Sequence, residues 1–422
     1  MIVLWVGNGI SRGEDKSALR MKVAELIQKL DAATLAERSQ AEHALVELGP
    51  VILPLLPAPE LIETPSARET IKRLRPVMER RAARESSAPS HVSLSGELSL
   101  GDIAKEIRRQ TGNTVIVSDH AGITESKLSV DWTRTLFWEV LDDCCKRADI
   151  QWQFVPGTDI IQLVPQSEKV SPEIAVNRTG PFRLAITNVE IRPVVGEEPQ
   201  RIVRVSGHLS IEPRLRPLFL TMAAAQVRAT SDQEVALPPW SPEAKYEFPV
   251  ADGGRDAPVR WDFRLPPEFI IKTISIQGKL GCQVAAATER VVFDQTSQTR
   301  GTVRRRGGVS VRLRHLNIEP VESDLLNEEI GIVVSYDHGG PAFESHRSWI
   351  FHNAVYLETK DGKRTSYTDF ETTQQADGAI AVDYRWQTVA APATQYLFVY
   401  EAPTLIIDVP IEIDLSGIPI EK

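Results

Sequence analysis

The stretch richest in residues that could bind a metal is "SYDHGGPAFESHRSWIFHNAVYLETKDGKRT", residues 335–365. Its candidate ligands are Asp337, His338, Glu344, His346 and His352. In an extended segment His346 and His352 would lie about 20 Å apart, too far for one ion. The segment has neither an HxH nor an HxxxH pair. The spacing therefore predicts no metal site, and we expect no cofactor.

The same segment raises the question of hydrolase chemistry, because Ser345 is followed directly by His346. The surrounding letters, "FESHR", lack the strand-to-helix turn that exposes a nucleophilic serine. Neighbouring residues of a strand also point to opposite faces of the sheet. The sequence thus predicts no enzyme, and a site built from Glu344, His346 and Arg347 stays as an alternative hypothesis.

Aromatic residues suggest a second kind of site. In "LPPWSPEAKYEF", Trp240 follows two prolines and Tyr246 comes six residues later. An exposed tryptophan on a β-sandwich loop can stack against a sugar ring, which favours carbohydrate binding. The alternative is a tryptophan folded back over the edge of the sandwich.

Arginines offer a third possibility, the binding of an anionic glycan or an acidic partner. Arg214 and Arg216 in "IEPRLRPLFL" are expected on one strand face. Residues 300–314, "RGTVRRRGGVSVRLR", contain six arginines and no acid.

For the arginine-rich run, the alternative is a solvated surface. Residues 304–306 would then lie in an interdomain linker. Arg312 and Arg314 would face Glu412 and Asp414 on the last strand.

The first residues, "IVLWVGNGISRG", resemble either a dinucleotide-binding turn or an export signal. The glycines are spaced GxGxxxG instead of GxGxxG, and a further helix follows where a second strand is required. An apolar core followed by small residues is typical of an export signal, although no basic residue precedes it. We therefore predict a truncated or atypical signal at 1–13 and a periplasmic or otherwise exported protein, with a cytoplasmic protein as the alternative if residues 1–13 are not a signal.

The composition limits the class of protein. A chain of 422 residues predicts several domains, and a net charge of −9 gives no general attraction to nucleic acid. Three cysteines exclude a disulfide scaffold, and Cys144 and Cys145 are expected to pack as small apolar residues. No apolar stretch is long enough to span a membrane.

Helical periodicity covers residues 16–86. The second helix is expected to stop at Gly49 and Pro50, and a third, very basic helix to begin at Pro65. With its turn "LGPVILPLL", this segment resembles a single HEAT-like helical unit.

Residues 91–165 alternate between strand and helix periods. Ser99 is expected to cap the helix "LSLGDIAKEIRRQTGN", which Gly112 would end. Together with "KLSVDW", "FWEVLDDCCKRADIQWQF" and "IIQLVP", this segment resembles the short N-terminal domain of secretins and TonB-dependent receptors (STN). The resemblance implies a small βα-sandwich that contacts proteins in the envelope of diderm bacteria.

The remaining residues repeat with a period of about 125. "RLAITNVEI" at 183–191 matches "SVRLRHLNI" at 310–318, and other alternating apolar stretches recur at similar offsets. Such alternation predicts antiparallel β-sandwiches. We expect two tandem sandwiches related by duplication, at 180–296 and 308–420, each enclosing its own core.

The predicted fold class is therefore a multi-domain α+β protein with a helical segment, a small βα-sandwich and two β-sandwiches. The predicted function is non-enzymatic binding or scaffolding in the envelope through the STN-like domain and the sandwich loops. An envelope protein or a glycan is the expected partner. Carbohydrate binding is the first alternative and a hydrolase-type enzyme the second.

Overall fold

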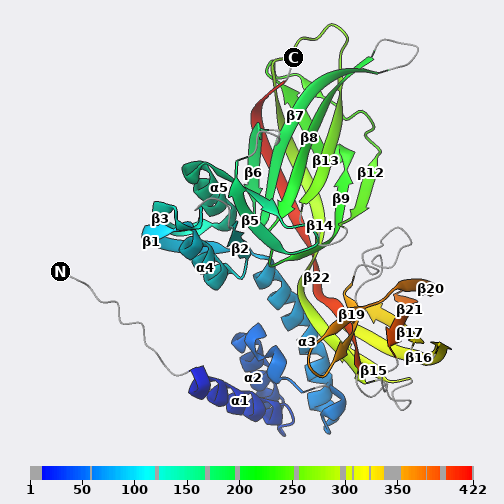
Figure 1. Cartoon of the computed structure of the whole chain (residues 1–422). Coiled ribbons are helices and arrows are strands. Elements are labelled where there is room, and N and C mark those ends of the chain that lie inside the picture. Colours follow the sequence, from blue (N-terminus) through cyan, green and yellow to red (C-terminus); the bar gives the residue numbers. More distant parts are fainter. Residues whose placement is uncertain are drawn as a thin grey trace. The chain divides into compact units, whose positions relative to one another are not determined.

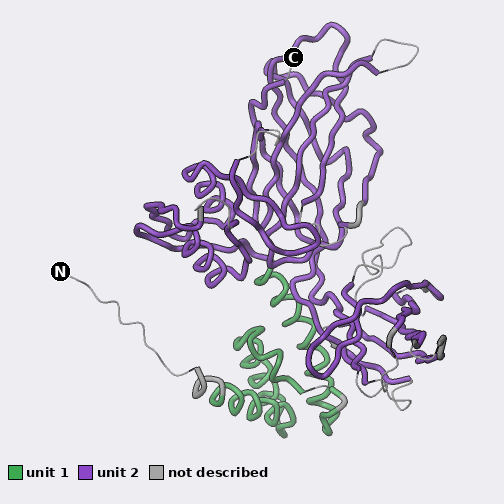
Figure 2. The backbone as a smooth tube through the Cα atoms, in the orientation of Figure 1, with its two compact units in different colours: residues 1–86 green, residues 87–422 purple. Residues whose placement is uncertain are grey.

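The computed structural model describes residues 12–57, 59–118, 123–166, 172–194, 200–250, 256–294, 301–306, 308–322, 325–336, 353–376, 378–389 and 396–420. The chain divides into two compact units, Met1–Ser86 and Ser87–Lys422, which Figure 2 shows in different colours. Residues 1–11 of the expected export signal lie outside the described part, and Arg12 and Gly13 already belong to the first helix.

The first unit is helical, as predicted. Its elements are α1 (Arg12–Lys29), α2 (Leu35–Leu48), the 3-10 turns η1 (Pro50–Leu55) and η2 (Pro59–Leu61), and α3 (Pro65–Ser87). Gly49 ends α2 with a φ of 72°, a value that favours glycine, and Pro50 follows. Leu30, Leu45 and Ile71 are buried in the core of this unit. None of the described helices is both long and apolar enough to cross a membrane.

The second unit begins with alternating strands and helices. Its elements are β1 (His91–Ser99), α4 (Leu100–Thr111), β2 (Thr114–Val117), η3 (Ile123–Glu125), β3 (Lys127–Leu136), α5 (Phe137–Ala148), β4 (Ile150–Phe154) and β5 (Ile160–Pro165). β1 pairs with β3, and β5 lies between β2 and β4. Both predicted ends of α4 are confirmed, since Ser99 Oγ accepts a hydrogen bond from the Asp102 N–H and Gly112 is left-handed.

The rest of the second unit is built from three antiparallel sheets (Figure 1). The four-stranded sheet is β13 (Asp256–Leu265), β8 (Gln200–Ile211), β7 (Phe182–Val194) and β6 (Ala175–Thr179). The five-stranded sheet is β15 (Val303–Arg306), β16 (Val309–Glu322), β17 (Leu325–Tyr336), β21 (Ala379–Val389) and β20 (Asp369–Ala376). The main path of the eight-stranded sheet is β11 (Ala236–Leu237), β10 (Val227–Ser231), β14 (Thr273–Asp294), β22 (Tyr396–Pro419), β18 (Val355–Thr359) and β19 (Arg364–Ser366). Its other two strands form a branch, in which β12 (Lys245–Pro249) pairs with β9 (Arg216–Ala223) and β9 pairs with β14.

Two strands of the eight-stranded sheet are unusually long and pair along their whole length. β14 and β22 are antiparallel from the pair Thr273–Pro419 at one end to the pair Asp294–Leu397 at the other. We call this pair the central ribbon. In Figure 1 it runs from the four-stranded sheet to the five-stranded sheet.

Each half of the central ribbon packs in a different hydrophobic core. Ile276 and Ile413 lie in the core that the four-stranded sheet covers, which we call sandwich 1. Phe293 and Phe398 lie in the core that the five-stranded sheet covers, which we call sandwich 2. Each core therefore takes half of β14 and half of β22.

This sharing differs from the prediction of two sandwiches with separate cores at 180–296 and 308–420. The prediction places residues 411–418 in the second sandwich. In the structure, sandwich 1 buries Ile411, Ile413, Leu415 and Ile418. Alternating apolar letters show which face of a strand is buried, but not which sheet covers that face.

The α/β part is attached to sandwich 1 by a cluster of charges. Asp142 of α5 accepts hydrogen bonds from Arg178 of β6 and from Arg183 of β7. The Arg183 side chain is 4% exposed and also forms an ion pair with Glu173. The indole N–H of Trp138 donates to the carbonyl of Pro181 at 2.9 Å. Buried charges that are paired in this way hold two parts of a chain in one arrangement.

The central ribbon leads to a prediction about stability. Replacing Ile413 by alanine should lower the free energy of unfolding by about 2–5 kcal/mol, the usual cost of truncating a buried isoleucine. Replacing Glu412, whose side chain is 55% exposed and paired with Lys279, should cost about 1 kcal/mol or less. Urea titrations measure both values.

The same variant tests which core contains Ile413. In methyl NMR spectra of Ile413→Ala, the resonances of Val203 and Val205 should shift, because these side chains share the core of sandwich 1. Shifts confined to Val311 and Val334 of sandwich 2 would contradict the assignment.

Candidate functional site

A pocket of about 450 Å³ lies beside β13, the edge strand of the four-stranded sheet. Its wall includes both aromatic residues proposed from the sequence, Trp240 and Tyr246. The pocket is also lined by His208, Arg260, Trp261 and Asp262.

Trp240 is held at the edge of β13 by its backbone and by a stacked cation. The backbone N–H of Trp240 donates to the backbone carbonyl of Asp262 at 2.7 Å, and Pro239 forms a β-bridge with Phe263. The guanidinium of Arg264 lies 5.1 Å from the centre of the indole ring and donates to the Trp240 carbonyl. Trp240 thus folds back on the sandwich edge, and it still lines the pocket.

Tyr246 and Trp261 complete the aromatic lining. Tyr246 belongs to β12, and its side chain is 45% exposed. Trp261 belongs to β13 and is 5% exposed. Its indole N–H is buried and makes no hydrogen bond within the described residues.

The charged side chains at the pocket differ in whether they are paired. Asp262 is held by two hydrogen bonds of 2.8 Å from Arg204, and His208 lies 3.1 Å from Asp256. Arg260 is exposed and makes no hydrogen bond or ion pair with any described residue. Among the pocket's lining residues it is the one arginine or lysine.

Arg214 is paired with a buried carboxylate inside the protein. It lies in the turn before β9, so it does not share a strand face with Arg216 as predicted. Its Nε donates at 2.7 Å to Glu212, a carboxylate that is 1% exposed and also accepts from Ser90 and Asn113. Arg214 therefore helps join the α/β part to sandwich 1.

The Arg216 side chain also has a hydrogen-bond partner inside the protein. Its guanidinium donates to Asn353 Oδ1 at 2.7 Å, and burial lowers the pKa of the Arg216 side chain. Asn353 in turn donates to the hydroxyl of Tyr400 on the central ribbon. Both guanidinium groups thus have partners inside the protein, and their contact with a glycan stays a prediction.

The arginine-rich run also differs from its prediction. Val303–Arg306 is the strand β15 and not a linker, and Arg304 lies over the ring of Phe293. Arg314 lies 3.5 Å from Asp383 of sandwich 2.

The acidic residues expected to face this run have other partners. Glu412 pairs with Lys279 at 2.8 Å, and Asp414 accepts from Gln277. The expected contact of Arg312 and Arg314 with them is wrong because that end of β22 lies in sandwich 1.

Glu344, His346 and Arg347 lie outside the described residues, as do Asp337, His338 and His352. The hydrolase hypothesis and the histidine spacing in that segment stay predictions.

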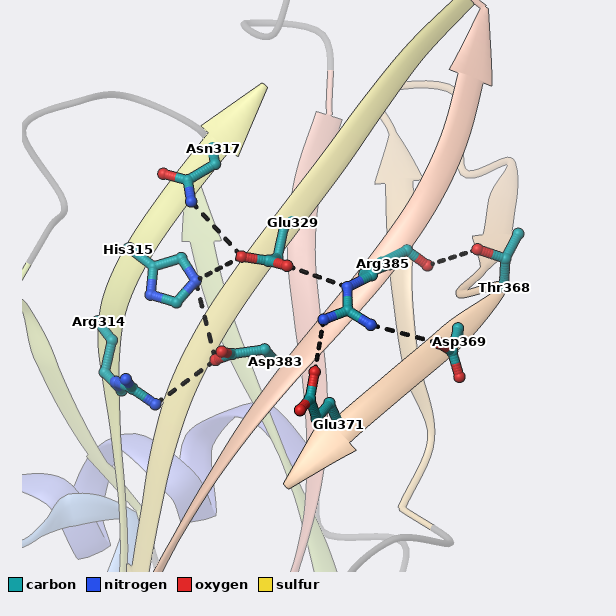
Figure 3. A network of polar contacts seen from close by, with 9 residues as sticks. All are labelled: Arg314, His315, Asn317, Glu329, Thr368, Asp369, Glu371, Asp383 and Arg385. Atoms are coloured by element: carbon teal, nitrogen blue, oxygen red, sulfur yellow. Dashed lines mark hydrogen bonds and ion pairs between the residues drawn. The ribbon is translucent and has the colours of Figure 1, made fainter. Parts of the chain in front are cut away.

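One group that sequence reasoning missed could hold a metal: His315, Glu329 and Asp383, shown in Figure 3. His315 Nε2 lies 3.2 Å from Glu329 Oε1 and 3.8 Å from Asp383 Oδ1. A hydrogen bond from Arg385, ahead of one from His315, keeps the pKa of the Glu329 carboxyl below its ordinary value. No local motif connects these residues, and only the register of β16, β17 and β21 brings them together.

Comparisons with known proteins add little to this geometry. No family model and no curated protein matches the chain. Among solved structures, bovine butyrophilin is 11% identical over 54% of this chain and 99% of that chain, with a TM-score of 0.17. A similarity at that score carries no argument about fold or function.

The three buried cysteines lead to a prediction about thiol reactivity. Burial raises the pKa of Cys144 and of Cys282 to about 12, and it raises the pKa of Cys145 as well. At pH 8 a thiol with such a pKa is ionised in about one molecule in 10⁴, so none should act as a nucleophile. A chromogenic disulfide reagent should find no fast-reacting thiol in the native protein and all three after unfolding. A native thiol that reacts as fast as free cysteine would contradict this.

Proposed function

We propose that this protein is a non-catalytic binding protein and that the pocket beside β13 takes a carbohydrate with an anionic group. The observation that carries the proposal is one pocket lined by Trp240, Tyr246 and the unpaired Arg260. Aromatic faces suit the apolar faces of sugar rings, and a guanidinium suits a carboxylate or a sulfate.

Trp261, which forms the inner wall of the pocket, favours a ligand rich in oxygen atoms. The buried indole N–H of Trp261 can only donate, and it has no acceptor within the described residues. A sugar hydroxyl seated at this wall would supply the acceptor after a small rotation of the indole. An apolar ligand would leave the donor unsatisfied, which is unfavourable.

The pocket's other charged groups favour binding over catalysis. Both Asp262 oxygens accept bonds from Arg204, so the carboxylate is poorly placed to take a proton from a ligand. His208 faces Asp256, and no hydrogen bond among the described residues joins His208 to the hydroxyl of Ser206 or Ser241, the two serines that line the pocket. The protein would therefore bind its ligand without transforming it.

A second candidate function is protein contact in the bacterial envelope through an STN-like domain. The order of strands and helices from β1 to β5, with a two-stranded and a three-stranded sheet, supports this proposal. In the same proposal residues 1–13 are an export signal and residues 16–86 a HEAT-like unit. Pull-down from an envelope extract tests it, and recovery of no partner from such an extract would contradict it.

We also propose that the two sandwiches arose by duplication. The sequence offset of 123 matches Trp261 of β13, buried in sandwich 1, with Tyr384 of β21, buried in sandwich 2. In the central ribbon each long strand gives one half to each sandwich, which is the arrangement expected of two related halves that exchange strands.

The pocket gives a prediction for Trp240. Replacing it by alanine should weaken the binding of an acidic polysaccharide, such as a polyuronate, at least about tenfold, equal to about 1.4 kcal/mol, because the stacking face is lost. Isothermal titration calorimetry with the polyuronate and with a neutral glucan provides the measurement.

Arg260 supplies a matched test of the anionic group. Arg260→Ala should weaken binding of the polyuronate and leave any binding of the neutral glucan unchanged. Arg312→Ala, an exposed strand arginine of sandwich 2, should change neither. Binding that is indifferent to both Trp240→Ala and Arg260→Ala would overturn the proposal, as would the absence of binding to any polysaccharide.

A further inference from the structure

Three neighbouring strands of sandwich 2 place polar residues in one row on the outer face of the five-stranded sheet. His315 of β16 pairs with Gly331 of β17, and Gly331 pairs with Asp383 of β21. Glu329 comes two residues before Gly331 on the same strand, so it lies on the same face. The alternate residues of these strands, such as Ile330 and Val382, point into the core.

Gly331 is the residue that lets the flanking side chains meet. A Cβ atom at this position would lie 2.3 Å from His315 Cε1 and 2.5 Å from Asp383 Oδ1. The imidazole and the carboxylate therefore lean over the glycine from the two outer strands of the row, and Figure 3 shows these two side chains near each other. Any other residue in the middle of the row would separate them.

The donor atoms have the spacing that a metal ion requires. The nitrogen and the two carboxylate oxygens all lie within 4.8 Å of one another, with 3.2 and 3.8 Å from His315 Nε2 to the two carboxylates. In a tetrahedral Zn²⁺ site with bonds of 2.0–2.2 Å, neighbouring donor atoms lie about 3.4 Å apart. Both distances from His315 Nε2 are within about 0.4 Å of that value, and the two carboxylate oxygens lie no more than 4.8 Å apart.

A separate observation is that one carboxylate oxygen of the cluster lacks a hydrogen-bond donor. Asp383 is 7% exposed, and its Oδ1 atom is buried without a hydrogen bond from any described residue. Arg314 Nη1 forms an ion pair with this oxygen at 3.5 Å, a long distance for a hydrogen bond, and His315 Nε2 lies at 3.8 Å. Leaving a buried carboxylate oxygen without a donor is costly, and a metal ion at the cluster would satisfy it.

Surrounding residues hold the ligands in place. Arg385 donates to Glu329 Oε2 at 3.0 Å and is itself held by Glu371 and Asp369. This leaves Glu329 Oε1 facing His315. Residues that orient the ligands in this way are typical of metal sites.

We propose that His315, Glu329 and Asp383 bind a divalent transition metal ion of the Zn²⁺ class. One imidazole nitrogen and two carboxylate oxygens suit such ions, and three protein ligands leave a position for water or for a ligand group. A pocket of about 340 Å³, lined in part by Glu329, Arg385 and Asn317, lies next to the cluster. The metal site is independent of the carbohydrate pocket in sandwich 1.

Calorimetry with Zn²⁺ alone tests the proposal on the full chain, freed of metal with a chelator and carrying no affinity tag. The wild-type chain should bind one ion, and His315→Gln and Asp383→Asn should each weaken binding at least tenfold. His208→Gln is the matched control, because His208 also faces an aspartate, at 3.1 Å, but without a third ligand. It should bind as the wild type does.

A measurement on the wild-type chain covers the case in which a variant fails to fold. Diethyl pyrocarbonate modifies free imidazoles, and peptide mapping should show that Zn²⁺ protects His315 and leaves His208 reactive. Absence of a bound ion, binding that is unchanged in His315→Gln, or equal modification of His315 with and without Zn²⁺ would overturn the proposal.

Discussion

The pairing of β14 with β22 is the constraint on which the rest of the second unit depends. Each strand contributes apolar side chains to both sandwiches, so neither core is complete without residues of both β14 and β22. Burying a side chain such as Phe398 contributes about 1.5–3 kcal/mol. Each sandwich gains this stabilisation only while β14 and β22 stay paired, and the same pairing is required by the other sandwich. The two candidate sites, one in each sandwich, are thereby parts of one body.

Local sequence signals predicted local structure well. Ser99 and Gly112 bound α4 as expected, because an N-cap hydroxyl and a left-handed glycine act on backbone groups of their own helix turn. Gly49 and Pro50 end α2 for equally local reasons. Apolar alternation likewise identified the strands of the sandwiches.

What the sequence could not predict depends on contacts between distant strands. The alternation at residues 411–418 is the same whichever sandwich buries it. His315, Gly331 and Asp383 form a row only through the register of three strands, and nothing in the letters around Gly331 indicates that two side chains close over it. Trp240 and Tyr246 could be proposed from composition, whereas their common pocket required the fold.

The arginines show how strongly environment decides the role of one residue type. Arg214 neutralises the buried Glu212, and Arg216 donates a hydrogen bond to Asn353. Both arginines therefore stabilise junctions within the chain. Arg260, which no pattern distinguished, is exposed beside the aromatic pocket. A guanidinium beside a carboxylate inside the protein is already satisfied, and an exposed one is available to a ligand.

Native-state hydrogen exchange in increasing denaturant tests the central ribbon most directly. Because both cores share β14 and β22, amides of β8 in sandwich 1 and of β17 in sandwich 2 should lose protection at the same denaturant concentration, in one cooperative step. Loss of protection in β17 at a concentration that leaves β8 fully protected would show two independent sandwiches and contradict the account.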